Sequence, residues 1–274
     1  MNRLDIKKQK QVIASLVEGN SIRATVRMTG VAKNTIMKLL IDIGKACDEY
    51  QNKVFRDLPC KRIQVDEIWS FCYAKEKNVP EDKRWKLGYG DVWTFTAICA
   101  DTKLVPCWYI GNRDMHHATI FMKDLEARLK NRVQLTTDGH KMYLWAVDSA
   151  FGSEVDFSQL VKIYGASLEG EKRYSPAQCL GAEKHKINGN PNSKDISTSY
   201  VERQNLTMRM NMRRFTRLTN AFSKKVENLS YAVALHFMYY NFCRIHQTLR
   251  VTPAMEAGVT DHVWEIEEIL VLLI

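Results

Sequence analysis

The sequence lacks the long apolar segments of a membrane protein. Its 274 residues contain no run of eighteen apolar residues, although 45% of the chain is hydrophobic and 26% is charged. The first residues, MNRLDIKKQKQVIASL, interrupt their apolar positions with charges, whereas a secretory signal has a short apolar core before its cleavage site. We therefore expect a soluble protein of the cytoplasm that has no membrane partner.

The sequence also lacks paired cysteines. Seven cysteines occur, at positions 47, 60, 72, 99, 107, 179 and 243, and no two of them form a C-x-x-C motif. This pattern disfavours both a zinc module and a disulfide framework. We expect the cysteines to be reduced and structural.

Charges of one sign are missing from particular segments of the chain. Forty Lys and Arg residues against 31 Asp and Glu residues give a formal net charge of +9. Residues 1–58 hold eleven basic and six acidic residues, and residues 203–225 hold seven basic residues and no acid. Two separate basic segments are typical of a protein that contacts a polyanion at two places, and nucleic acid is the obvious candidate.

The N-terminal segment has the pattern of three short helices. A helical apolar stripe over positions 12–17 ends at EGN, Ser21 can cap a second helix, and TGV predicts a tight turn with Gly30 available for positive φ. A third helix over residues 33–43 would complete a helix-turn-helix and lie in the major groove. The residues expected to reach DNA are Arg23, Lys33, Asn34, Thr35 and Lys38. A plain three-helix bundle with a solvated polar face is the alternative.

After residue 59 the apolar period changes from helical to alternating. RIQVDEIWSFCYAK, DVWTFTAICAD and LVPCWYIG predict three strands in a meander, and Asp114 can cap an amphipathic helix after them. VQLTTD and FSQLVKIYG predict two further strands, with the helix GHKMYLWAV between them. Residues from about 166 to 199 are rich in Gly, Pro, Ser and Lys, and predict a long insertion before the next helix.

Three acids hold special positions in this order of elements. Asp66 lies on the polar face of the first strand, Asp138 ends the fourth strand, and Glu202 opens the helix after the insertion. If strands one and four are adjacent and this helix packs across them, the three carboxylates meet. Converging carboxylates repel one another unless a cation lies between them, and hard oxygen ligands select Mg²⁺ or Mn²⁺. Two such ions would suit phosphodiester chemistry.

Four motifs together resemble the DDE-class transposases of bacterial insertion sequences, most of all the insertion-sequence-one family. The motifs are QVDEIW around Asp66, TTDGHKMY around Asp138, STSYVERQNLTMRMNMRRFTRLTNAFSKK around Glu202, and YNFCRIHQTLRVTPAMEAG near the end. Two departures stand out. The cysteine-based zinc module that often opens members of this family is missing, and 63 residues separate Asp138 from Glu202, which is more than is usual in this class.

The resemblance implies a particular α/β architecture. Residues 1–58 would form a helix-turn-helix DNA-binding domain. Residues 59–253 would form a catalytic domain of the ribonuclease-H-like, retroviral-integrase type, with a mixed five-stranded sheet flanked by helices and the insertion at about 166–199. Residues 254–274 would form an acidic tail helix. Asp66, Asp138 and Glu202 would be the catalytic residues and the ligands of two Mg²⁺ or Mn²⁺ ions.

The resemblance also implies a function. The protein would bind the terminal inverted repeats of its own element, cleave phosphodiester bonds at the ends, and join the 3′-hydroxyl to target DNA. Pairing two ends implies a homo-oligomer, at least a dimer, acting in the bacterial nucleoid. Two alternatives stay open: a metal-dependent nuclease without strand transfer, and a catalytically inactive DNA-binding regulator derived from a transposase.

The helix around Glu202 has a second interpretation. Ser199 followed three residues later by Glu202 is also a capping box, in which the carboxylate bonds the Ser199 N–H. Basic and polar residues follow Glu202 at helical spacing, and several share its face. The residues of this segment expected to hold DNA are Arg203, Asn205, Arg209, Arg213 and Arg214.

The C-terminal tail lacks basic residues altogether. Residues 254–274 carry five acids and no Lys or Arg, so the tail is expected to meet protein and not nucleic acid. Apolar residues 263, 266, 270 and 273 recur at near-helical spacing, and Trp264 adds a large apolar face. This stripe would pack either on the chain's own catalytic domain or on a second protomer.

Overall fold

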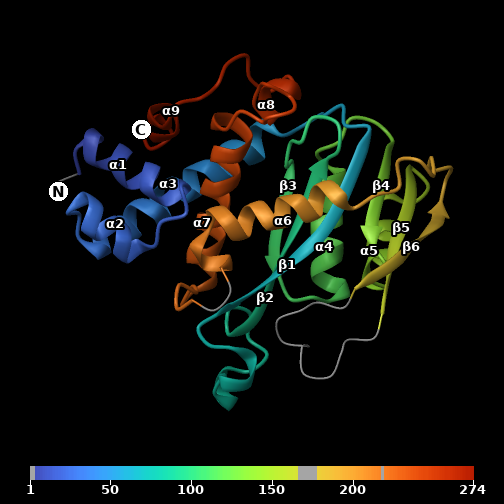
Figure 1. Cartoon of the computed structure of the whole chain (residues 1–274), viewed down its shortest axis with the longest axis horizontal. Coiled ribbons are helices and arrows are strands. Elements are labelled where there is room, and N and C mark those ends of the chain that lie inside the picture. Colours follow the sequence, from blue (N-terminus) through green and yellow to red (C-terminus); the bar gives the residue numbers. More distant parts are fainter. Residues whose placement is uncertain (1–3, 166–177, 217–218) are drawn as a thin grey trace.

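The protein is a layered α/β structure built around one mixed sheet (Figure 1). The computed structural model describes residues 4–165, 178–216 and 219–274. In chain order the elements are α1 (Ile6–Val17), α2 (Ile22–Thr29), α3 (Lys33–Val54), β1 (Arg62–Cys72), η1 (Glu76–Asn78), η2 (Glu81–Lys83), β2 (Gly90–Cys99), β3 (Cys107–Gly111), α4 (Met115–Glu126), β4 (Val133–Asp138), α5 (Met142–Phe151), β5 (Val155–Tyr164), β6 (Cys179–Asn188), α6 (Ser199–Asn211), η3 (Arg213–Phe215), α7 (Val226–Met238), η4 (Tyr239–Cys243), α8 (Pro253–Glu256) and α9 (Ile266–Val271).

The sheet joins a meander to a parallel pair of strands. Its strand order is β3-β2-β1-β4-β5-β6, with β1 parallel to β4 and β4 parallel to β5, while the remaining neighbours are antiparallel. The register pairs Gln64 with Thr136, so Asp66 in β1 and Asp138 at the end of β4 reach the same level. Beyond Asp66, β1 runs on to Cys72 paired with β2. The predicted adjacency of strands one and four is therefore confirmed.

The sheet has six strands where five were expected. The additional strand, β6, pairs antiparallel with β5 and lies inside the range expected to be an irregular insertion. Nine of its ten residues are exposed, so the strand has no buried face and no apolar alternation by which the sequence could have shown it. The first part of the expected insertion, residues 166–177, lies outside the described residues.

Helices cover both faces of the sheet. On one face α4 and α5 bury side chains against β1, β2 and β4, and the rings of Phe95 in β2 and Phe121 in α4 lie 5.6 Å apart. On the other face α6 and α7 cover β1 and β2, where Val201 is buried in a cluster with Ile68 and Val92. Because successive strand residues point to opposite faces, neighbouring residues of β1 face different helical layers.

The N-terminal helices begin and end as the sequence predicts, except for the third. Ser21 caps α2 by accepting a hydrogen bond from the Ala24 N–H, and Gly30 ends it with φ of 70°. Helix α3 was expected over residues 33–43, but it continues to Val54 and packs against α7. At this crossing a Cβ on Gly44 would lie 2.4 Å from Tyr231 Cβ, so only glycine allows the approach.

The acidic tail packs on the chain's own N-terminal helices. It forms the short helices α8 and α9 and not one long tail helix. Trp264 lies with its ring centroid 5.1 Å from that of Tyr50 in α3 and 5.0 Å from that of Phe242, and Lys10 in α1 pairs with Glu267. The apolar stripe thus packs within the chain, but it lies mainly on α1 and α3 and reaches the expected catalytic domain only through contacts such as that with Phe242.

None of the helices in the described ranges combines the length and the apolar character that crossing a bilayer requires.

Candidate metal centre

An open pocket of about 780 Å³ lies where β1, β4 and β5 meet the first turns of α6. Its walls include all three acids that the sequence singled out, Asp66, Asp138 and Glu202. Asn205 and Arg209, which follow Glu202 by one and two helical turns, line the same pocket. The expected meeting of strand ends and helix is therefore present, although the carboxylates do not all approach one another equally.

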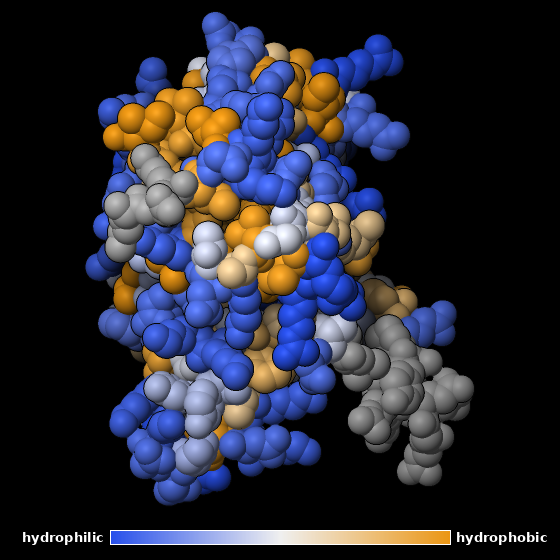
Figure 2. All heavy atoms as spheres, turned by 90° about the vertical axis from the view of Figure 1, so that its left-hand side faces the viewer, coloured by the Kyte–Doolittle hydropathy of each residue, from blue (hydrophilic) through white to orange (hydrophobic). Residues whose placement is uncertain are grey.

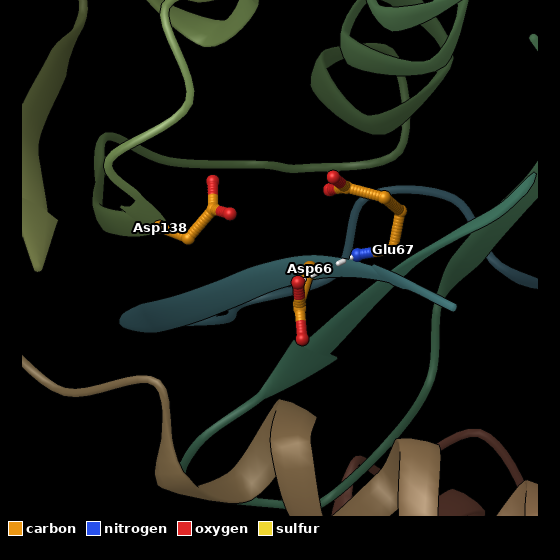
Figure 3. Close-up of side chains that lie close together, drawn as sticks. All are labelled: Asp66, Glu67 and Asp138. Atoms are coloured by element: carbon orange, nitrogen blue, oxygen red, sulfur yellow. Dashed lines mark hydrogen bonds between the residues drawn. The ribbon is translucent and has the colours of Figure 1, made fainter. Parts of the chain in front are cut away.

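The closest acidic group consists of Asp66, Glu67 and Asp138. Within the described ranges, these three form a group in which one carboxylate oxygen of each residue lies within 4.8 Å of the others. Glu202 is outside this group, and Glu67 is its third member in place of Glu202. Figure 3 shows Asp66 turned toward α6, whereas Glu67 and Asp138 lie on the other side of β1.

Glu67 is a buried acid with two partners, and sequence analysis missed it. Its side chain has 0% exposure, accepts a hydrogen bond from the Tyr143 hydroxyl at 2.6 Å, and pairs with Arg113 Nε. Burial raises the pKa of Glu67, as does nearby Asp138, while Tyr143 and Arg113 act in the opposite direction. The available signal was an acid on the otherwise apolar face of a predicted strand, which requires a buried partner.

Asp66 lacks such compensation. Its two carboxylate oxygens accept hydrogen bonds from the Glu67 backbone N–H at 2.8 Å and from Asn205 Nδ2 at 2.9 Å, and both donors are uncharged. Burial raises the pKa of Asp66 to about 7, with the negative charge of Glu67 as the next cause and those of Asp138 and Glu202 adding to it. A cation bound here would relieve this cost.

Asp138 is held at the turn between β4 and α5. Its Oδ1 accepts a hydrogen bond from the His140 N–H at 3.0 Å, and Gln159 Nε2 donates to the Asp138 carbonyl at 2.9 Å. Arg113 Nη2 lies 3.7 Å from Asp138 Oδ2, so the same guanidinium contacts Glu67 and approaches Asp138. These contacts fix the carboxylate at the pocket without covering it.

Glu202 is occupied by a lysine. Lys162 Nζ in β5 lies 2.5 Å from both carboxylate oxygens, and the Thr198 hydroxyl donates to Oε1 at 2.5 Å. The capping box that was the alternative interpretation is not formed, because the Ser199 N–H donates to Ser197 Oγ at 3.2 Å. Glu202 therefore lines the pocket with its carboxylate paired to Lys162. Lys162 is a second residue of the site that sequence analysis missed.

The predicted DNA-contacting residues of this segment differ in exposure. Arg203 is exposed, Asn205 is buried against Asp66, and Arg209 is half-buried on the pocket wall. Helix α6 ends at Asn211, so exposed Arg213 belongs to the following turn and not to the helical face expected for it.

Arg214 is partly buried and is held by a neighbouring segment of the chain. Its Nη1 donates to Ser223 Oγ at 2.5 Å, and burial lowers the pKa of the guanidinium. The assignment of Arg214 as a DNA contact stays a prediction, and its bond to Ser223 makes the guanidinium less available than that of exposed Arg213. Here the side chain joins the segment after α6 to the segment before α7.

The N-terminal residues expected to reach DNA are all exposed. Arg23 lies near the start of α2, and the others occupy the first two turns of α3. These other residues are Lys33, Asn34, Thr35 and Lys38. Their exposure leaves their polar and basic groups accessible to a ligand.

Comparison with known protein families finds no model that matches this chain. A search of curated proteins gives no match either. The interpretation of the pocket therefore depends on its geometry and chemistry.

The donor set fits a hard divalent cation. Carboxylate oxygens are the ligands that Mg²⁺ and Mn²⁺ prefer, and three acids within 4.8 Å supply them from adjacent positions. Only Arg113 approaches this group as a basic partner within the described residues, and it pairs with Glu67. Asp66, Glu67 and Asp138 are the group that could hold an ion, while Glu202 lies on another wall of the pocket and is paired with Lys162.

Proposed function

We propose that this protein is a DNA transposase of the DDE class, with an N-terminal helix-turn-helix unit and a ribonuclease-H-like catalytic domain. The observation that carries the proposal is the approach of Asp66 and Asp138, from adjacent parallel strands, in a pocket whose other wall holds Glu202. The exposed basic residues of α3 and the basic segment around α6 support DNA as the substrate.

The residues of the pocket would have distinct roles. Asp66, Asp138 and Glu202 would hold Mg²⁺ or Mn²⁺. The ions would supply activation of a water or 3′-hydroxyl and stabilisation of the leaving oxygen. Asn205 holds the Asp66 carboxylate by its hydrogen bond of 2.9 Å, and Arg209, which lines the same pocket, would contact a phosphate.

Recognition would be separate from chemistry. The exposed groups at the start of α3 would read the terminal inverted repeats, because polar and basic side chains on the first turns of such a helix can reach base edges. Since two element ends must be held together for joining, the active form would be at least a dimer.

Cleavage of labelled element-end DNA with Mg²⁺ tests the proposal. We expect Asp66→Asn and Asp138→Asn to abolish cleavage, because each replaces a charged carboxylate ligand of the metal by a neutral amide. End binding should be retained, because α1 to α3 are unchanged. Asp148→Asn is the matched control, since Asp148 is an exposed acid of α5 outside the pocket.

Three results would contradict the proposal in different ways. Specific end binding without cleavage in Mg²⁺ or Mn²⁺ would support the inactive regulator. Cleavage without joining to a target would support the nuclease. Full cleavage by either pocket variant would remove the pocket from the chemistry.

A further inference from the structure

The connection between the inner strands β1 and β2 forms an arm beyond the ends of these strands. This β1–β2 arm comprises residues 73–89 and contains the turns η1 and η2. It projects beyond the ends of the two strands in Figure 1, and at the foot of the molecule in Figure 2 pale side chains lie among hydrophilic ones. No residue of the arm lines the acidic pocket, so the role proposed for the pocket does not account for the arm.

The base of the arm is fixed to the body of the protein. The Tyr73 N–H donates to the Ser223 carbonyl at 2.9 Å, and Val79 is 4% exposed. The rings of Tyr73 and Tyr89 lie 5.0 Å apart, and Lys83 Nζ lies 4.6 Å from the Tyr73 ring centroid. The arm therefore holds its tip in a defined position.

The tip exposes one tryptophan almost completely. Trp85 is 90% exposed, and its φ of 66° lies in the left-handed region that a bulky residue rarely adopts. A large aromatic side chain normally lies in a core or an interface, because its burial from water is favourable. The arm is fixed to the body of the protein, and at its tip a strained backbone presents an exposed indole. This arrangement indicates a binding platform.

The charges around Trp85 indicate the class of partner. Arg84 and Lys86 flank it directly, and Lys75 and Lys77 are exposed at the other turn of the arm. Two of the three acids of the arm are engaged locally, since Glu81 pairs with Arg84 at 2.7 Å and Glu76 accepts from the Asp91 N–H at 3.0 Å. The third, Asp82, is exposed, so the five basic residues of the arm still outnumber its acids. Aromatic faces interleaved with cations are the arrangement that stacks bases and contacts phosphates.

We propose that the β1–β2 arm binds single-stranded or unpaired nucleic acid, with the Trp85 indole stacked on a base and neighbouring cations on the phosphates. The arm begins seven residues beyond Asp66, directly after β1 ends, which is about 23 Å of extended chain. A strand held at the tip therefore lies several nucleotides from the acidic pocket. This site goes beyond the proposed function, since it requires no cleavage at that pocket.

Binding measured without metal tests the arm separately from catalysis. Fluorescence anisotropy in EDTA would use labelled DNA of about 20 nucleotides as a single strand, a blunt duplex, and a duplex with an overhang. We expect Trp85→Ala to weaken binding of the single strand and of the overhang by about tenfold, the loss of one stacked base. Blunt-duplex affinity should be unchanged, and Trp85→Phe should retain most of the affinity.

The chain offers a matched control in Trp145. It is an exposed tryptophan of α5, 61% accessible, on a different part of the surface. We expect Trp145→Ala to bind all three DNAs like the unmodified protein, and both variants to keep its melting temperature because both side chains are exposed.

Two outcomes would overturn the proposal. One is unchanged single-strand affinity in Trp85→Ala. The other is a change of mass in analytical ultracentrifugation with unchanged DNA affinity, which would make the arm a contact between copies of the chain. Neither outcome bears on whether the acidic pocket cleaves DNA, and loss of cleavage in the pocket variants would leave the arm's binding result standing.

Discussion

The raised pKa of Asp66 makes the stability of the protein depend on pH in a specific direction. Burial and neighbouring acids raise the pKa from 3.8 to about 7, so ionising this carboxyl costs free energy in the folded state. In the folded protein the neutral carboxyl is favoured over the ionised one. The stability that this preference gives is fully present below the unfolded pKa of 3.8 and is lost as pH rises through about 7. Replacing Asp66 by Asn removes the ionisation and hence this loss.

The magnitude follows from the size of the shift. Each pKa unit corresponds to about 1.4 kcal/mol, so the full difference between 3.8 and about 7 amounts to about 4 kcal/mol. About 3 kcal/mol of it should develop between pH 5 and pH 8. Asn can keep the hydrogen bond from the Glu67 N–H, and rotation of the Asn205 amide would give it an acceptor.

Urea denaturation in EDTA at pH 5 and pH 8 measures the effect. The quantity compared is the free energy of unfolding of Asp66→Asn minus that of the unmodified protein. We expect this gap to increase by about 3 kcal/mol from pH 5 to pH 8. Adding Mn²⁺ at pH 8 should narrow the gap, since the cation favours the ionised carboxylate. A gap that stays constant with pH, or that shrinks toward pH 8, would refute the electrostatic reasoning. Asp148→Asn controls for loss of an exposed acid.

Two further predictions concern the ion pair and the tail. Lys162→Met should raise the affinity for Mn²⁺ about tenfold in calorimetry without DNA, because the metal no longer displaces an ammonium from Glu202. Weaker Mn²⁺ binding would mean that the lysine supports the site. Trp264→Ala should lower the free energy of unfolding by about 3 kcal/mol, because two ring contacts with Tyr50 and Phe242 are lost. A change below about 0.5 kcal/mol would show that these ring contacts add little to the stability of the folded chain.

The sequence predicted those parts of the fold in which local pattern and tertiary packing agree. The alternation in RIQVDEIWSFC and the acid that ends VQLTTD gave β1 and β4, because each strand has a buried face. Asp114 caps α4 as expected, accepting from the His117 N–H at 2.9 Å. Asp66 and Asp138 were found for this reason: each lies at a position that the strand pattern alone defines.

The parts that were missed depend on partners far away in the sequence. Glu67 is stable in the interior because Arg113 and Tyr143 reach it, and no local pattern around Glu67 reveals either of them. Arg214 has the same spacing as surface arginines, and only the fold places it beside Ser223. Helix α3 extends past its predicted end because α7 covers it, which is tertiary packing overriding a weak local signal.

The distribution of charge around the pocket explains why Asp66 is the position that most needs a cation. Glu67, its neighbour in β1, faces the α4 and α5 layer and is balanced there by Arg113. Glu202, on the α6 side, is balanced by Lys162. Asp66 lies between these two ion pairs with only amide donors on its oxygens, and its neighbours add negative charge. Asp138, the fourth acid of the pocket, has Arg113 Nη2 at 3.7 Å. Among the described residues Asp66 is thus the pocket acid without an ion-pair partner, and it is the one whose buried charge a cation would relieve most.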